Sequence, residues 1–158
     1  MNPALLHILH QAFFGGVAAV GFAVLFNCHP RTLPACFGAG VLALAVRTVG
    51  QELGFSLAVA SFFAALLLAM VDKVWHEFAS ARGSVLAVVG AIPMVPGSLA
   101  AKVLMSVFAF LRSAQSQGTE ATIATWNNLM MLIFTLAAIG TALALPSLIP
   151  AAKIADEE

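Results

Sequence analysis

An arginine inside an otherwise apolar stretch is the first residue of this sequence that could bind a ligand. Arg47 follows an uncharged run that begins at Leu33. A guanidinium in a membrane segment usually faces protein or a water-filled cavity. It suits a carboxylate, because two parallel hydrogen bonds can form at once. The alternative is that Arg47 sits at the end of its helix and extends to the lipid headgroups. The pattern leaves both interpretations open.

The stretch AIPMVPGS, residues 91–98, interrupts a second apolar run with two prolines and a glycine. Backbone groups freed by such a break cannot stay unpaired against lipid. In broken transporter helices, the freed amides of the second half point at an anionic substrate group. We therefore predict that Pro96, Gly97 and Ser98 bind substrate, and that Pro93, Pro96 and Gly97 make the structural break. The alternative is a proline kink that only shapes helix packing.

Other polar residues in apolar runs are further candidates. Asn127 and Asn128 offer donors and acceptors to a substrate with an ammonium and a carboxylate group. They could equally hold neighbouring helices together. His7, His10 and Gln11 share one face of the first helix. A histidine could carry protons near neutral pH, but we expect this face to lie in the membrane interface.

Nothing in the sequence indicates catalysis. It contains no Ser–His–Asp order, no HExxH and no glycine-rich phosphate loop. Cys28 and Cys36 provide neither a disulfide framework nor a metal-ligand spacing. We therefore expect a protein that is not an enzyme and holds no metal or cofactor. The formal net charge is +0, which argues against nucleic acid as a partner.

Composition indicates that these candidate residues lie in a lipid bilayer. Hydrophobic residues make up 61% and charged residues 9% of the 158-residue chain. A soluble domain is about half apolar and about a quarter charged, and a soluble fold of this length could not bury so much apolar surface. We predict an all-α integral membrane protein with a single transmembrane domain over residues 1–158.

About five transmembrane helices fit the apolar runs, because a spanning helix needs about 20 residues. The expected spans are 4–26, 33–50, 55–75, 84–111 and 121–145. The last is expected to stop at Pro146. The fourth is broken at Pro93, Pro96 and Gly97, and its pieces form either one broken span or a re-entrant hairpin.

The basic residues predict an orientation, since lysine and arginine gather on the cytoplasmic side. With five crossings they divide four against two, with Arg31, Lys73, Arg82 and Lys153 on one side and Arg47 and Arg112 on or near the other. The N-terminus is therefore expected outside and the C-terminus in the cytoplasm. If the fourth segment were a re-entrant hairpin and not a span, one terminus would lie on the opposite side of the membrane.

Two stretches resemble the threonine/serine exporter family, specifically its small, all-membrane part. One is GFAVLFNCHPRTLPACFGAG, residues 21–40, which is followed by Arg47; the other is VVGAIPMVPG, residues 88–97. The pattern is a Gly-Phe-Ala-x-x-Phe-Asn run ending the first helix, a basic turn, an arginine late in the second helix and a Pro-x-x-Pro-Gly break. The similarity covers roughly residues 10–146.

The resemblance implies importance for the residues at matching positions, namely Gly21, Phe22, Arg31, Arg47, Pro93, Pro96 and Gly97. One of Asn127 and Asn128 matches an asparagine of the last helix. Some members carry an aromatic hydroxyl about four residues after the Pro-Gly pair, where this chain has Leu99 to Lys102. That departure bears on the substrate more than on the fold.

The resemblance also implies a function and a partner. It implies a membrane subunit of a secondary exporter for small carboxylate-bearing metabolites, either threonine and serine or a dicarboxylate such as succinate. The partner would be a larger membrane subunit of the same family, in a bacterial inner membrane, with a homo-oligomer also open. We expect an ion gradient, of protons, to drive transport. The alternatives are a non-transporting structural or assembly subunit and a self-assembling homo-oligomeric pore.

Overall fold

The computed structural model describes residues 3–79, 85–112 and 119–148, and within these ranges every element is a helix. In chain order the elements are α1 (Pro3–Leu25), η1 (Pro30–Thr32), α2 (Leu33–Glu52), α3 (Leu57–Ala79), α4 (Leu86–Ala91), η2 (Ile92–Met94), α5 (Gly97–Arg112) and α6 (Thr119–Leu148). The predicted all-α class is confirmed, and the helices match the predicted spans closely.

Four helices are long and apolar enough to cross a membrane, namely α1, α2, α3 and α6. Their mean hydropathy lies between 1.6 and 2.1. The helices on the two sides of the break, α4 with η2 and α5, are long and apolar enough only when taken together. They meet at an angle of 50°. The prediction of about five spans, with the fourth broken near Pro93 and Gly97, is confirmed.

One predicted boundary is wrong, because α6 does not stop at Pro146. The helix continues through this proline to Leu148. A proline so close to a helix end removes only a late backbone bond and distorts little. The Pro146 carbonyl accepts a hydrogen bond from Nζ of Lys73 on α3 at 3.3 Å, which ties the end of α6 to its neighbour.

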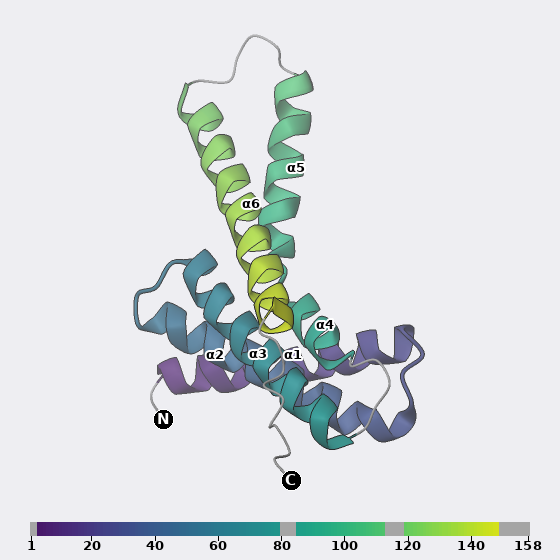
Figure 1. Cartoon of the computed structure of the whole chain (residues 1–158). Coiled ribbons are helices and arrows are strands. Elements are labelled where there is room, and N and C mark those ends of the chain that lie inside the picture. The colour runs from purple at the N-terminus through teal and green to yellow at the C-terminus, as the bar shows by residue number, and fades with distance from the viewer. Residues whose placement is uncertain (1–2, 80–84, 113–118, 149–158) are drawn as a thin grey trace.

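The helices form a base and a projecting hairpin (Figure 1). The base contains α1, α2, α3 and α4, while α5 and the N-terminal half of α6 extend away from it side by side. The C-terminal half of α6 returns to the base and packs on α3. Because α5 begins directly at the break, the break is the joint between base and hairpin.

Small residues bring α1 and α2 close together. A Cβ added to Gly40 of α2 would collide with the Gly15 carbonyl oxygen of α1 and lie 2.6 Å from the Ala19 Cβ. Alanines dominate the buried core, and Ala19, Ala23 and Ala43 are fully buried. Small residues at such crossings are typical of helices that associate inside membranes, where packing replaces the hydrophobic effect.

Two turns in the left-handed region set the antiparallel course of the first three helices. Asn27 has a φ of 55° just after α1, and the next amide, of Cys28, donates to the Ala23 carbonyl at 2.9 Å. Asparagine tolerates this helix-ending conformation better than other non-glycine residues. Gly54, with a φ of 89°, makes the turn between α2 and α3. The C-terminal end of α2 thereby lies beside the N-terminal end of α1.

We predict that Gly40→Ala destabilises the fold by about 1–3 kcal/mol, the usual cost of overpacking. The new methyl group would meet the backbone of α1, which cannot move aside as a flexible side chain would. The matched control is Gly38→Ala on the same helix, where an added Cβ meets nothing within 4 Å. Its expected effect is neutral or a gain of up to about 1 kcal/mol, from helix propensity. Thermal unfolding of the purified variants in detergent compares them, and equal stabilities would contradict the close crossing.

Candidate functional site

A polar cavity of about 190 Å³ lies where the N-terminal half of α1, the C-terminal half of α2 and the helix break meet. Its lining residues are His7, Gln11, Leu44, Arg47, Thr48, Gln51, Pro93, Val95, Pro96, Gly97 and Ser98. The volume is below the roughly 300–1,000 Å³ of drug-sized sites. It therefore suits a small metabolite.

Arg47 joins α2 to the break. Its guanidinium donates a hydrogen bond to the backbone carbonyl of Met94 at 2.6 Å. In an unbroken helix this carbonyl would accept the N–H four residues on, that of Ser98. The prolines deny it that partner, so Arg47 supplies the missing donor. The side chain thus turns into the protein instead of extending away to headgroups.

The rest of the guanidinium remains available to a ligand. A guanidinium carries five N–H donors, and Met94 accepts one of them. Among the residues that the structure describes, no carboxylate pairs with Arg47, and the nearby Glu52 pairs with His7 instead. The cavity therefore contains a half-buried positive charge that the described part of the chain does not neutralise.

The start of α5 offers fewer free amides than predicted. The Gly97 N–H donates to the Val95 carbonyl at 2.8 Å, and those of Leu99 and Ala100 donate to the Pro96 carbonyl at 3.0 and 3.1 Å. Within the described chain only the Ser98 amide lacks a backbone acceptor at this turn. The turn closes on itself because the Pro96 carbonyl accepts two bonds. The predicted array of amides is therefore reduced to one, beside the Ser98 hydroxyl.

Gly97 faces open space, as a residue that lines a ligand path should. It is exposed, and an added Cβ would meet nothing within 4 Å. Its backbone φ is not positive. Among the described glycines, only Gly54 has a positive φ. Neither a left-handed conformation nor a contact within the described protein therefore requires glycine at this position.

The first helix contributes two side chains to the lining. His7 and Gln11, one helical turn apart, line the cavity; that this face lies in the membrane interface stays a prediction. The Nδ1 atom of His7 also lies 3.2 Å from Oε1 of Glu52, the last residue of α2. A signal existed in the sequence: Arg47 and Gln51 have the same spacing of four as His7 and Gln11, so each helix presents one short polar face.

Other predicted residues lie away from this cavity. Asn127 and Asn128 belong to the N-terminal third of α6, in the projecting hairpin, and do not line it. Their role as substrate ligands stays a prediction that this cavity does not use. Gly21 and Arg31 lie near the turn between α1 and α2, at the opposite end of these helices.

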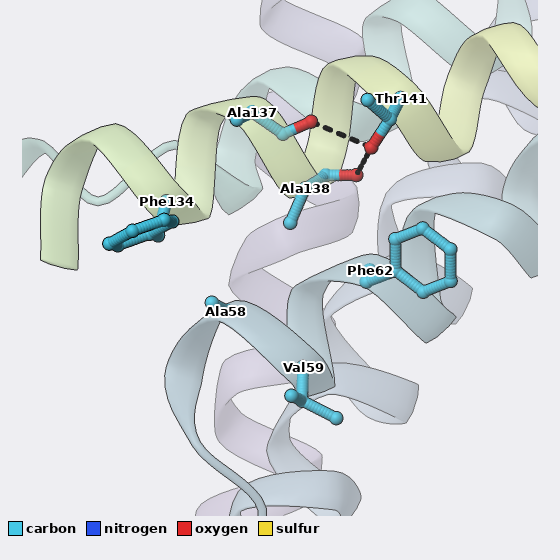
Figure 2. A pocket seen from close by; sticks show the side chains of 7 residues that line it. All are labelled: Ala58, Val59, Phe62, Phe134, Ala137, Ala138 and Thr141. Atoms are coloured by element: carbon cyan, nitrogen blue, oxygen red, sulfur yellow. Dashed lines mark hydrogen bonds between the residues drawn. The ribbon is translucent and has the colours of Figure 1, made fainter.

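A larger apolar groove lies between α3 and α6, and Figure 2 shows its lining. Its volume is about 430 Å³, and the residues around it are Ala58, Val59, Phe62, Phe134, Ala137, Ala138 and Thr141. The Thr141 hydroxyl contacts the carbonyl oxygens of Ala137 and Ala138 at 2.8 and 3.1 Å. The one polar side chain of the groove is thus satisfied by its own helix, and the groove has no charge that would hold a carboxylate.

The family follows from a match over nearly the whole chain. The family model described as Threonine/Serine exporter, ThrE, matches residues 11–149. That range includes Arg47, the break and all of α2 to α6. No solved structure matches the chain. The chain belongs to the threonine/serine exporter family, and it is a membrane protein with an exporter-type transport role.

Proposed function

We propose that this chain is the membrane subunit of a secondary exporter for small carboxylate-bearing metabolites, and that the Arg47 cavity binds the carboxylate. One observation carries the proposal: a half-buried guanidinium, fixed through Met94, lines a polar cavity without a carboxylate partner. An unpaired charge in a low-dielectric setting is costly. An anion that enters the cavity relieves that cost, and the Ser98 hydroxyl and amide lie in the same lining.

The charges around the cavity favour an amino acid over a dicarboxylate. Arg47 is the only permanently charged residue in the lining. Glu52, which does not itself line the cavity, adds a negative charge beside His7, which does. A zwitterion such as threonine or serine would match this arrangement of one positive and one negative group. The second carboxylate of succinate would approach Glu52 and find no second fixed cation, since Lys102 is exposed on α5 and does not line the cavity.

The proposed partner is a larger membrane subunit, because this chain alone offers only part of a path. The cavity begins near Gln11 and Leu44, about the middle of α1 and α2, and ends near His7 and Gln51. Beyond it, fully buried alanines fill the space between the same helices. This closed packing counts against a pore made by one chain. The hairpin of α5 and α6 bears large exposed apolar side chains, including Phe108, Trp126 and Phe134, which lipid or a partner would cover.

Arg47→Lys tests the carboxylate site. Lysine keeps the charge and one donor for the Met94 carbonyl, but it loses the planar pair of donors that grips a carboxylate. We expect threonine efflux from loaded cells to fall at least tenfold, with membrane abundance unchanged. Parental efflux in Arg47→Lys would remove Arg47 from the binding site and leave it a purely structural role.

Gly97→Leu tests whether the space at the break is the substrate path. Gly97 lines the cavity and an added Cβ there meets nothing within 4 Å, so we expect assembly to survive while efflux is abolished. Gly140→Leu on α6 is the control, because that glycine is also exposed with nothing within 4 Å of an added Cβ. Gly97→Ala should lower efflux less than Gly97→Leu, and Pro93→Ala least. If Gly97→Leu and Gly140→Leu export alike, the break is a packing kink.

Mass measurement of the complex extracted from native membranes tests the partnership. We expect a mass well above the 16.4 kDa of this chain, with a larger membrane subunit or further copies of the chain in the complex. A lone monomer, extracted under conditions in which other native membrane complexes stay intact, would contradict the proposal.

A further inference from the structure

A hydrogen-bonded pair of side chains, His7 and Glu52, lies beside the Arg47 cavity. His7 lines the cavity, and its Nδ1 atom lies 3.2 Å from Oε1 of Glu52. Their side chains are 53% and 42% exposed, so neither is enclosed by the described part of the protein. The pair lies where the start of α1 meets the end of α2; His7 lines the cavity and Glu52 stands behind it, outside the lining.

The hydrogen bond decides which nitrogen of His7 is left for a ligand. A carboxylate oxygen only accepts hydrogen bonds, so a neutral His7 carries its proton on Nδ1 and leaves Nε2 as an acceptor. With His7 neutral, the pair has a net charge of −1. When His7 takes up a second proton, Nε2 becomes a donor and the pair becomes neutral overall.

We propose that the His7–Glu52 pair is the ammonium site of this transporter and that a proton and the substrate's ammonium group compete for it. The inference rests on the proposed function, in which Arg47 holds the carboxylate of the same substrate. With His7 neutral, the site has one positive and one negative end, which match a zwitterion. Protonation of His7 removes the negative end and turns its acceptor into a donor, so the ammonium group is released.

Among the described residues of the helices that pack around the pair, no other titratable group lies beside it. The remaining titratable or charged residues of α1, α2 and α3 are His10, Cys36, Arg47, Asp72, Lys73, His76 and Glu77. His10 does not line the cavity, and its ring packs on Phe14 with centroids 4.6 Å apart. Cys36 lies near the far end of α2, and the four residues of α3 lie at the end of that helix remote from its turn with α2. The elements α4 and η2, which also pack on α1, carry no titratable side chain.

The competition has a consequence for transport. One proton and one ammonium group cannot occupy the pair together. Each passage of substrate in one direction therefore favours the passage of a proton in the other, which is the exchange that export against a gradient requires.

The test compares two ligands on the full chain, purified in its native complex. L-threonine and 3-hydroxybutyrate differ in that the second lacks the ammonium group. Calorimetry between pH 8 and pH 5.5 should show the affinity for threonine falling on acidification, by at most about tenfold per pH unit, since one proton is exchanged. The affinity for 3-hydroxybutyrate should stay constant or rise. Threonine binding should also release protons, measured in buffers of different ionisation enthalpy.

Three variants assign the effect to the pair. His7→Gln should bind threonine with an affinity that no longer varies with pH, whereas the control His10→Gln should behave like the parent. Glu52→Gln should weaken threonine binding at pH 8 at least fivefold and leave 3-hydroxybutyrate binding unchanged. This variant tests the inference even if His7→Gln does not fold.

Three results would overturn the inference. The first is a parental pH dependence in His7→Gln. The second is an equal loss of both ligands in Glu52→Gln, and the third is a pH-independent affinity of the parent for threonine. Failure of the parent to bind either ligand would instead overturn the proposed function on which the inference rests.

Discussion

The hydrogen bond from Arg47 to the Met94 carbonyl is the interaction on which the site depends. A helix broken inside a membrane leaves backbone groups that lipid cannot satisfy. A guanidinium in the same environment needs partners that lipid cannot supply. Their hydrogen bond of 2.6 Å gives the Met94 carbonyl a donor and the Arg47 guanidinium an acceptor. The bond also fixes one end of the guanidinium, so a side chain that lines the cavity is held in a defined position, and such preorganisation lowers the entropic cost of binding.

This bond is possible only because α1, α2 and α4 are held close together. The contact of Gly15 with Gly40 sets the spacing of α1 and α2. Gly90 does the same for α4, where an added Cβ would lie 2.9 Å from Leu68 of α3 and 3.1 Å from Ala39 of α2. Bulkier residues at these crossings would move the break away from α2. The small residues of the core therefore serve the site as much as the stability of the bundle.

The sequence predicted the helices well and the site only in part, for a physical reason. Long apolar runs and a proline pair are local signals, so the spans and the break at Pro93 to Gly97 follow from them. The cavity depends on which helix faces meet, and that is a non-local property. The pairing of His7 with Glu52 spans 45 residues, and the bond of Arg47 to Met94 spans 47. Asn127 and Asn128 have the right chemistry, but their place in α6 keeps them from the cavity, which no local pattern indicates.

The break also connects the two parts of the molecule. The cavity is lined by α1, α2 and the first turn of α5, while the rest of α5 leaves the base and pairs with α6 (Figure 1). Gly97 and Ser98 therefore belong to both the site and the projecting hairpin. The first turn of α5 is thus the part of the structure that joins the cavity to the projecting hairpin.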